Sequence, residues 1–336
     1  MIPRFVSPAA KMLLTALMSS VMATTVLAES PKVDETALTI IGYHEITDHR
    51  DALIPSYAVS EQQFSQHIDW LKNNGFHFIN VDQLIKAHQG KYKLPSKPVL
   101  ITVDDGYQSF YQHAYPIVRA KNIPIVLAVV GSWLQPKANQ KVDFAGESIE
   151  RNKILSWGEL KEMQQSGLVE IASHSYHLHQ GIIANPQGNL EPAAISRIYH
   201  PHSKSYESDA DYQARIYQDL KKNNDLLKEH GIRSPRVMVW PYGRYNMQLI
   251  QTAKQLGMPI TITLDDGADH AKQSLQNMSR ILVQGNMTTS ALAQEIKSRE
   301  LNFNDNNRPQ KIMHVDLDYI YDPNLEQQER NLGILL

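Results

Sequence analysis

Four apolar, strand-like segments of this sequence are each followed at once by a polar motif. The four pairs are residues 99–103 with Asp104-Asp105-Gly106, 169–173 with His174, 237–240 with Pro241-Tyr242-Gly243, and 260–264 with Asp265-Asp266-Gly267. Helical patterns separate these segments, and such alternation is typical of a mainly parallel sheet with helices outside it. In α/β barrels the carboxyl ends of the strands carry the chemistry, so we expect the motifs to meet at one mouth. The sequence therefore predicts an α/β fold, a distorted (β/α) barrel rather than an open sheet.

Hydrophobic periodicity predicts the individual elements. Strands are expected at residues 38–42, 76–81, 98–103, 125–130, 169–173, 236–240 and 259–264. Helices are expected at 64–71, which Gly75 ends, at the Ser156/Glu159 capping box, and at 216–227, which Gly231 ends.

The composition fits an ordinary globular protein and excludes several kinds of chemistry. The 336 residues are 42% hydrophobic and 20% charged, with a formal net charge of -2, so we expect no nucleic-acid partner. The chain contains no cysteine. Disulfides, thiolate metal ligands, thiol catalysis and a lipobox cysteine for a lipid anchor are therefore excluded.

The first 28 residues resemble a secretory signal peptide. Arg4 and Lys11 supply positive charge, residues 12–27 are largely apolar, and Ala28 ends a small-residue cleavage site before Glu29. A membrane anchor is the alternative, although the apolar run is shorter than the roughly 20 residues that a span needs. We expect a periplasmic or secreted mature protein that begins near Glu29.

Two of the motifs contain residue types that bind metal ions. Asp104 and Asp105 end a strand, where the chain bends, so one carboxylate would bind a metal while the other stays free as a base. Asp-Asp-Gly is also a common turn sequence. His174, His177 and His179 form a dense histidine cluster after a strand, which favours a metal site. Spacing alone leaves open whether His177 or His179 is the partner of His174.

Taken together, these motifs resemble those of the polysaccharide deacetylases with the NodB homology domain (carbohydrate esterase family four). The matching motifs are Thr102-Val103-Asp104-Asp105-Gly106, His174-Ser175 and Trp240-Pro241-Tyr242-Gly243. Residues 104–111 and 237–243, with Tyr43-His44, are most similar to the poly-β-1,6-N-acetyl-D-glucosamine N-deacetylases of the PgaB and IcaB type. The resemblance covers roughly residues 38–282 and implies the distorted (β/α) barrel of the NodB polysaccharide deacetylase type.

The resemblance implies metal-dependent hydrolysis of an acetamide. Asp105, His174 and His179 would bind one divalent metal ion and leave coordination positions open, as catalytic sites do. This ligand set suits zinc, nickel, cobalt or iron. Asp104 would act as general base, and we favour His44 as general acid, with a buried structural histidine as the alternative.

Three further residues are expected to face the substrate. The backbone N–H of Tyr107 would stabilise the developing oxyanion, as the resemblance implies. Trp240 and Tyr242 would form an apolar wall for a sugar ring, with ordinary core packing as the alternative. Asp265 and Asp266 are expected either to support the metal ligands from outside or to be loop residues, because the site already has its carboxylates.

Two positions depart from the usual family motifs. The orthodox second motif places its second histidine four residues after the first, where this chain has Leu178. The PgaB-like branch uses a spacing of five, which selects His179. The usual third motif has an arginine two residues before its proline, where this chain has Val239. The sequence therefore leaves open which residue orients Asp104.

The resemblance also implies a substrate and a domain plan. The substrate would be an extracellular polysaccharide, poly-N-acetylglucosamine, deacetylated during biofilm exopolysaccharide export, with outer-membrane export machinery as a further partner. A chitin or peptidoglycan deacetylase and a catalytically weak glycan-binding export scaffold are the alternatives. The deacetylase domain is expected at residues 29–308, with a linker at 302–310. Residues 309–336 resemble the truncated start of a glycoside-hydrolase-like domain, and the polar insertion at 180–211 is left without a role.

Overall fold

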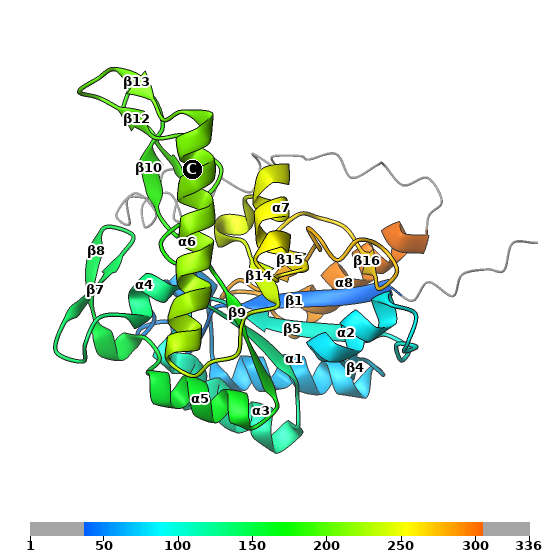
Figure 1. The fold of residues 1–336 in the computed structure, drawn as a ribbon. Coiled ribbons are helices and arrows are strands. Elements are labelled where there is room, and N and C mark those ends of the chain that lie inside the picture. The colour runs from blue at the N-terminus through cyan, green and yellow to red at the C-terminus, as the bar shows by residue number, and fades with distance from the viewer. Residues whose placement is uncertain (1–36, 305–336) are drawn as a thin grey trace, which may run out of the picture. The chain divides into compact units, whose positions relative to one another are not determined.

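The structure, a computed structural model, describes residues 37–304 of the chain. The predicted signal peptide and the predicted start of a second domain lie outside the described residues. The strands of the main sheet are β1 (Ala37–Tyr43), β4 (His77–Phe78), β5 (Pro98–Val103), β6 (Ile125–Val129), β9 (Val169–Ser173), β14 (Val237–Val239), β15 (Ile260–Ile262), β16 (Asp269–His270) and β17 (Ile281–Leu282). The α-helices are α1 (Glu61–Asn73), α2 (Val81–His88), α3 (Tyr115–Lys121), α4 (Gly131–Leu134), α5 (Trp157–Gln165), α6 (Asp209–Glu229), α7 (Met247–Gln255) and α8 (Thr289–Asn304), as Figure 1 shows.

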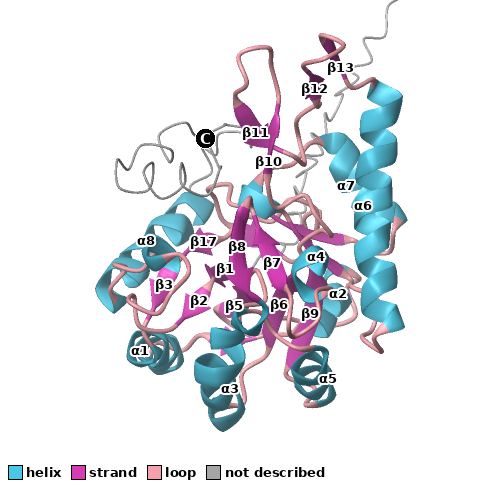
Figure 2. Ribbon diagram, turned by 90° about the vertical axis from the view of Figure 1, so that its left-hand side faces the viewer, coloured by secondary structure: helices cyan, strands magenta, loops and turns pink. Residues whose placement is uncertain are grey.

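The main sheet has nine strands and is mainly parallel. Its order is β15-β14-β9-β6-β5-β1-β16, with β17 beside β1 and β4 beside β5. The chain just before β17 reaches the opposite edge, because Met278 pairs in parallel with Ile262 of β15. The segment 278–282 thus contacts both β15 and β1, and the sheet is curled rather than flat (Figure 2). The predicted α/β barrel-like fold is confirmed.

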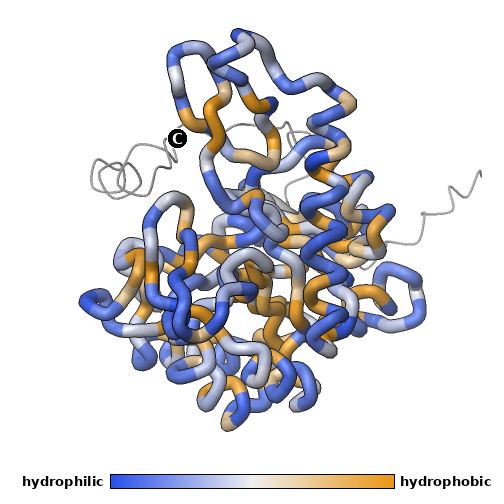
Figure 3. The backbone as a smooth tube through the Cα atoms, turned by 60° about the vertical axis from the view of Figure 1, so that its left-hand side comes forward, coloured by the Kyte–Doolittle hydropathy of each residue, from blue (hydrophilic) through white to orange (hydrophobic). Residues whose placement is uncertain are grey.

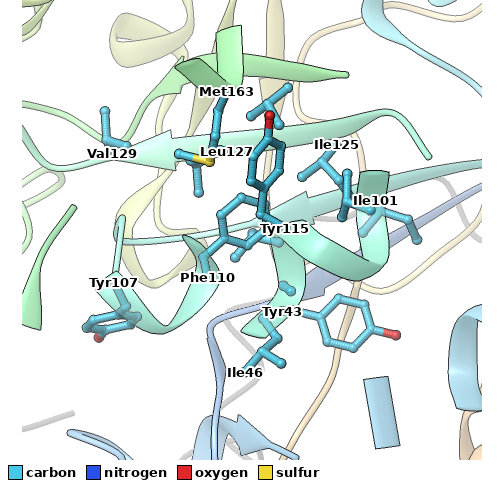
Figure 4. Close-up of a cluster of buried hydrophobic side chains, with 14 of the residues drawn as sticks. Tyr43, Ile46, Ile101, Tyr107, Phe110, Tyr115, Ile125, Leu127, Val129 and Met163 are labelled. Carbon is cyan, nitrogen blue, oxygen red and sulfur yellow. The ribbon is translucent and has the colours of Figure 1, made fainter. Parts of the chain in front are cut away.

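Alternating side chains of the strands fill two separate clusters. In β5, Ile101 and Val103 belong to the cluster that packs against α1, α3 and α5, whereas Leu100 belongs to the cluster on the other face. Figure 4 shows Ile101 near the rings of Phe110 and Tyr115. Figure 3 shows hydrophobic segments gathered in the interior and hydrophilic segments along the outside. Because both faces of β5 are covered, all six of its residues are buried, as is typical of a parallel strand.

Local sequence signals explain most of the helices. Ser156 and Glu159 form the predicted capping box at the start of α5. The predicted strand at 76–81 was too long, because Asn80 and Gln83 form a second capping box and α2 begins at Val81. Helix α8 runs to Asn304, so the first three residues of the predicted linker at 302–310 are helical.

Four two-stranded pairs lie outside the main sheet in the described part of the chain. They are β2 (Glu45–Ile46) with β3 (Ala58–Val59), β7 (Lys141–Phe144) with β8 (Glu147–Glu150), β10 (Gly181–Ile183) with β11 (Leu190–Pro192), and β12 (Tyr199–His200) with β13 (Ser205–Tyr206). The last two pairs form the predicted polar insertion, which projects beside the upper end of α6 (Figures 1 and 2). Within residues 37–304 no helix combines the length and the apolar character that a membrane span requires.

We expect the substitution Ile101→Ala to lower the free energy of unfolding by about 2–5 kcal/mol, because it leaves a cavity in a well-packed cluster. Ile101 is 0% exposed, whereas Ile183 on β10 is 38% exposed. The matched substitution Ile183→Ala should change the same free energy by less than about 0.5 kcal/mol. Urea denaturation of both variants measures the two values, and equal losses would contradict the assignment of β5 to the core.

Candidate metal centre

Asp105, His174 and His179 converge at the carboxyl ends of β5 and β9. The Oδ1 atom of Asp105 lies 3.4 Å from Nε2 of His174 and 3.4 Å from Nε2 of His179. One ligand atom from each of the three residues lies within 4.8 Å of the others, and this is the one such cluster found among residues 37–304. His177 points elsewhere, since its Nδ1 lies 3.2 Å from the hydroxyl of Ser132. The structure therefore places His179, rather than His177, beside His174.

Both histidines present Nε2 to the cluster because Nδ1 is held on the far side of each ring. Nδ1 of His174 donates to the carbonyl of Val239 at 2.8 Å. Nδ1 of His179 lies 3.1 Å from the hydroxyl of Tyr242. Such partners fix the orientation of metal-binding imidazoles, and a proton on Nδ1 leaves the lone pair of Nε2 free for a cation.

The strand ends that carry the site adopt strained backbone conformations. Asp105, Ser175 and Tyr242 have φ angles of 75°, 69° and 57°, in the left-handed region that residues with a side chain rarely adopt. Gly243 follows with φ at 66°, and a Cβ there would lie 2.6 Å from the side chain of Leu264. Strain of this kind costs about 1–3 kcal/mol per residue and concentrates at functional sites. It turns these side chains away from the regular alternation of a strand.

Asp104 is held by Arg280, which sequence reasoning missed. The guanidinium donates to Oδ1 of Asp104 at 2.9 Å and to Oδ2 at 2.6 Å, and to the hydroxyl of Thr102 at 3.0 Å. The side chains of Asp104 and Arg280 are each only 1% exposed. A Cβ at Gly42 would lie 2.9 Å from this guanidinium, so a glycine on β1 makes room for it. Arg280 therefore orients Asp104, a role for which the sequence, with Val239 in the third motif, left the residue open.

The buried charges shift one another strongly. Burial alone would raise the pKa of Asp104, but the charges of Arg280 and His174 and the hydrogen bonds from Arg280 hold that pKa well below its ordinary value. Burial raises the pKa of Asp105, while the nearby His44 and His174 oppose the rise. Burial lowers the pKa of both His174 and His179 to about 4, so both imidazoles are neutral at neutral pH. Neutral imidazoles are the form that binds metal ions.

These residues fit a divalent cation. The Oδ1 atom of Asp105 is buried and has no hydrogen-bond partner, although it faces two imidazoles. A buried carboxylate oxygen without a partner is costly. A cation would satisfy this oxygen and would reverse the upward shift of the Asp105 pKa. One carboxylate and two imidazoles match the three-ligand pattern of catalytic zinc sites and related metal sites.

The remaining predicted residues surround this cluster in different ways. Nε2 of His44 lies 3.9 Å from Oδ2 of Asp104, and its ring stacks on Tyr57 at 5.1 Å between centroids. Tyr107 follows the Asp104-Asp105-Gly106 turn, and that turn is tied down because the carbonyl of Gly106 accepts from the backbone N–H of Leu155 at 2.9 Å. His44 and Tyr107 therefore lie at the mouth with the metal-binding cluster.

The two predicted aromatic wall residues do not form a common wall. Trp240 is 0% exposed and packs with Leu178 and Met238, so its ring has no face for a sugar and serves the core. Tyr242 lies against His179, with 4.5 Å between ring centroids. Trp133, which the sequence analysis did not single out, also packs edge-on against His179 at 5.1 Å.

The second Asp-Asp-Gly motif stays outside the cluster. Asp265 accepts a hydrogen bond from the hydroxyl of Tyr245 at 2.6 Å. Asp266 is 76% exposed and pairs with Arg299 at 3.2 Å. Only the first of the two motifs contributes a carboxylate to the candidate metal centre.

The fold and the site, a buried aspartate and two histidines at the mouth of an α/β barrel, place this chain in the class of barrel proteins with a candidate catalytic metal centre. Comparison with known proteins gives the family. The family model described as "Polysaccharide deacetylase" matches residues 91–261. A poly-β-1,6-N-acetyl-D-glucosamine N-deacetylase of Escherichia coli (strain K12) is 37% identical over 314 residues, which are 92% of this chain and 45% of that protein. The chain belongs to the polysaccharide deacetylase family.

Solved structures give the same result. A de-N-acetylase from Aggregatibacter actinomycetemcomitans superposes with a TM-score of 0.72 at 34% identity, over 77% of this chain and 99% of that one. The deacetylase domain of BpsB from Bordetella bronchiseptica superposes with a TM-score of 0.67 at 37% identity, over 74% and 97% of the two chains. The fold is therefore that of the deacetylase domains. The chain spans about half the length, 45%, of the Escherichia coli relatives that it matches.

We expect the substitution Arg280→Met to lower the free energy of unfolding by about 3–5 kcal/mol at neutral pH, because it leaves the carboxylate of Asp104 buried and unpaired. In the wild type the pKa of Asp104 is lowered, so its ionised carboxylate stabilises the folded state at pH values above about 4, the ordinary pKa of an aspartate. In the variant burial would raise that pKa, so protonation would relieve the unpaired charge. The difference between the two proteins should therefore shrink as the pH falls from about 7 toward about 4, in urea denaturation at each pH.

Arg50 provides a matched control. Its guanidinium makes the same two-pronged contact with Asp48, at 3.0 and 3.2 Å, but both side chains are exposed. Arg50→Met should leave the free energy of unfolding nearly unchanged, because water and salt screen an exposed pair. A similar loss of unfolding free energy in both variants would show that burial does not make the pair of Asp104 and Arg280 more stabilising than an exposed pair.

Proposed function

We propose that this protein is a metal-dependent polysaccharide deacetylase that removes N-acetyl groups from poly-β-1,6-N-acetyl-D-glucosamine. The observation that carries the proposal is the convergence of Asp105, His174 and His179 beside a second carboxylate, Asp104, at the mouth of the barrel. The proposed substrate rests on the Escherichia coli relative, whose name specifies this polymer and which is 37% identical over 92% of the chain.

Asp105, His174 and His179 would hold one divalent ion, either zinc, nickel, cobalt or iron. The bound ion would supply Lewis-acid chemistry, lowering the pKa of water and polarising the acetamide carbonyl. Three protein ligands leave room for water and substrate. Trp133 and Tyr242 pack against His179 and limit the movement of its ring.

Asp104 would act as the general base. Arg280 keeps its carboxylate ionised and holds both oxygens in a fixed orientation. Asp104 takes a proton from the attacking water while the oxygen of that water forms a bond to the acetyl carbon. The backbone N–H of Tyr107 would donate to the oxyanion that develops on the acetyl group.

His44 would act as the general acid. Its Nε2 lies 3.9 Å from Asp104, so it shares the mouth with the base, and Tyr57 supports its ring from one side. His44 would donate a proton to the nitrogen as the carbon–nitrogen bond breaks. The products would be acetate and a glucosamine unit with a free amine.

The structure also bears on the alternative of a catalytically weak scaffold protein. The absent motif arginine was one reason to consider that alternative. Arg280 removes this reason, because it pairs with Asp104 through two hydrogen bonds from another part of the chain. Export through a signal peptide at residues 1–28, a role in the export of biofilm polysaccharide, and contact with outer-membrane export machinery complete the proposed function.

We expect Asp105→Ala to abolish acetate release from a β-1,6-linked N-acetylglucosamine oligomer, because the metal site loses its carboxylate ligand. Asp266→Ala alters the corresponding position of the second Asp-Asp-Gly motif, which is exposed, and should retain wild-type activity. Acetate release and metal content, measured for both variants and the wild type, test the proposal. Equal acetate release from wild type and Asp105→Ala would rule out the site assignment.

Removal of the metal should also abolish acetate release, and this loss should be reversible. Dialysis against a strong chelator is expected to abolish acetate release, and addition of zinc, nickel, cobalt or iron salts should restore it to different extents. The same series run on chitin oligomers and on peptidoglycan tests the substrate. A preference for either of these over the β-1,6-linked oligomer would contradict the proposed polymer.

A further inference from the structure

Helix α6 contacts the loop between His174 and His179 through a buried carboxylate. The two oxygens of Asp219 accept the backbone N–H groups of Tyr176, at 2.8 Å, and His177, at 2.9 Å. Burial raises the pKa of the Asp219 carboxyl group to about 6, and these two N–H groups oppose the rise. One side chain of α6 thus fixes two successive peptide groups that lie between the two histidines.

Asn223 lies one helical turn further along α6 and fixes the other side of His174. Its side-chain N–H donates to the hydroxyl of Ser173 at 2.8 Å and approaches the carbonyl of Val129 at 3.5 Å. Asn223 is fully buried. Because residues four apart share one face of a helix, Asp219 and Asn223 hold the chain on both sides of His174 from the same direction.

The loop needs such support because its path is unfavourable. Two side chains five residues apart do not share a face of either a strand or a helix, so the segment must curve to bring His174 and His179 together. Ser175 enters the curve with φ at 69°, a conformation that costs free energy. The N–H groups of Gly131 and Ser132 in α4 also support the loop, donating to the carbonyls of Ser175 and Tyr176 at 3.1 and 2.8 Å.

We propose that Asp219 and Asn223 are positioning residues of the metal centre, which hold the loop in the curve that lets both imidazoles bind one ion. This inference rests on the proposed function, because it requires that Asp105, His174 and His179 bind a metal. Neither residue touches the ion or the reacting atoms. Their effect on the site passes through the peptide groups of residues 176 and 177 and the hydroxyl of Ser173.

The test is a titration of the metal-free full chain with Co²⁺, whose visible absorption reports the coordination geometry. Asp219→Asn keeps the size of the side chain but turns one acceptor into a donor that faces a backbone N–H. We expect it to weaken Co²⁺ binding by about 10- to 100-fold, the range for loss of residues that orient metal ligands, and to change the absorption spectrum. Asn223→Ala should also weaken Co²⁺ binding and change the spectrum. If Asp219→Asn does not fold, the result for Asn223→Ala decides the test.

Two controls on the same helix separate positioning from general stability. Among residues 37–304 the carboxylate of Asp225 has Lys221 as its ion-pair partner, at the surface, so Asp225→Asn should bind Co²⁺ as the wild type does. Leu220 is fully buried and apolar, so Leu220→Ala should lower the melting temperature without changing Co²⁺ affinity. Loss of affinity in Leu220→Ala, in proportion to its loss of stability, would overturn the positioning role.

The remaining outcomes also separate the two proposals. Wild-type Co²⁺ affinity and an unchanged spectrum in folded Asp219→Asn and Asn223→Ala would overturn the positioning role alone. No specific Co²⁺ binding by the wild type would instead overturn the metal centre of the proposed function, and the inference with it.

Discussion

The buried ion pair between Asp104 and Arg280 connects the curl of the sheet to the chemistry at its mouth. Moving two charges out of water costs several kcal/mol per ion, so the pair is tolerable only with near-ideal geometry. That geometry exists because Arg280 belongs to the segment that contacts both β15 and β1, while Gly42 leaves space for its guanidinium. Because β17 pairs with β1, and β1 pairs with β5, the side chain of Arg280 reaches across β1 to Asp104 at the end of β5.

The candidate metal centre depends on the backbone as much as on side-chain packing. Asp105, Ser175 and Tyr242 each adopt a left-handed conformation where a strand ends. Regular strands would send neighbouring side chains to opposite faces, and at these three positions beside the metal-binding cluster the chain departs from that alternation. The strain is offset by burial and hydrogen bonding in the surrounding barrel, which is why such conformations persist mainly at functional sites. Burial in the same surroundings lowers the pKa of both imidazoles and keeps them neutral at neutral pH.

Sequence reasoning found what local patterns encode. The strands at 98–103 and 169–173, and the polar motifs that follow them, were predictable because strand periodicity and the end of a strand are local properties. The pairing of Asp104 with Arg280 was not, because 176 residues separate the partners. An arginine directly before the apolar residues 281–283 was the only local sign. Trp240 was misleading, because an aromatic residue beside a motif suits a core as well as a sugar.

One face of α6 links three parts of the molecule that the sequence presents as unrelated. Arg215, Asp219 and Asn223 follow one another at intervals of four residues. Arg215 donates to the carbonyls of Ala193 and Ser196 in the projecting insertion, at 2.9 Å each, while Asp219 and Asn223 bind the chain around His174. A helix of 21 residues is stiff over that length. Helix α6 therefore holds both the insertion and the loop between His174 and His179. The insertion is thereby connected to the metal centre through hydrogen bonds to the same helix.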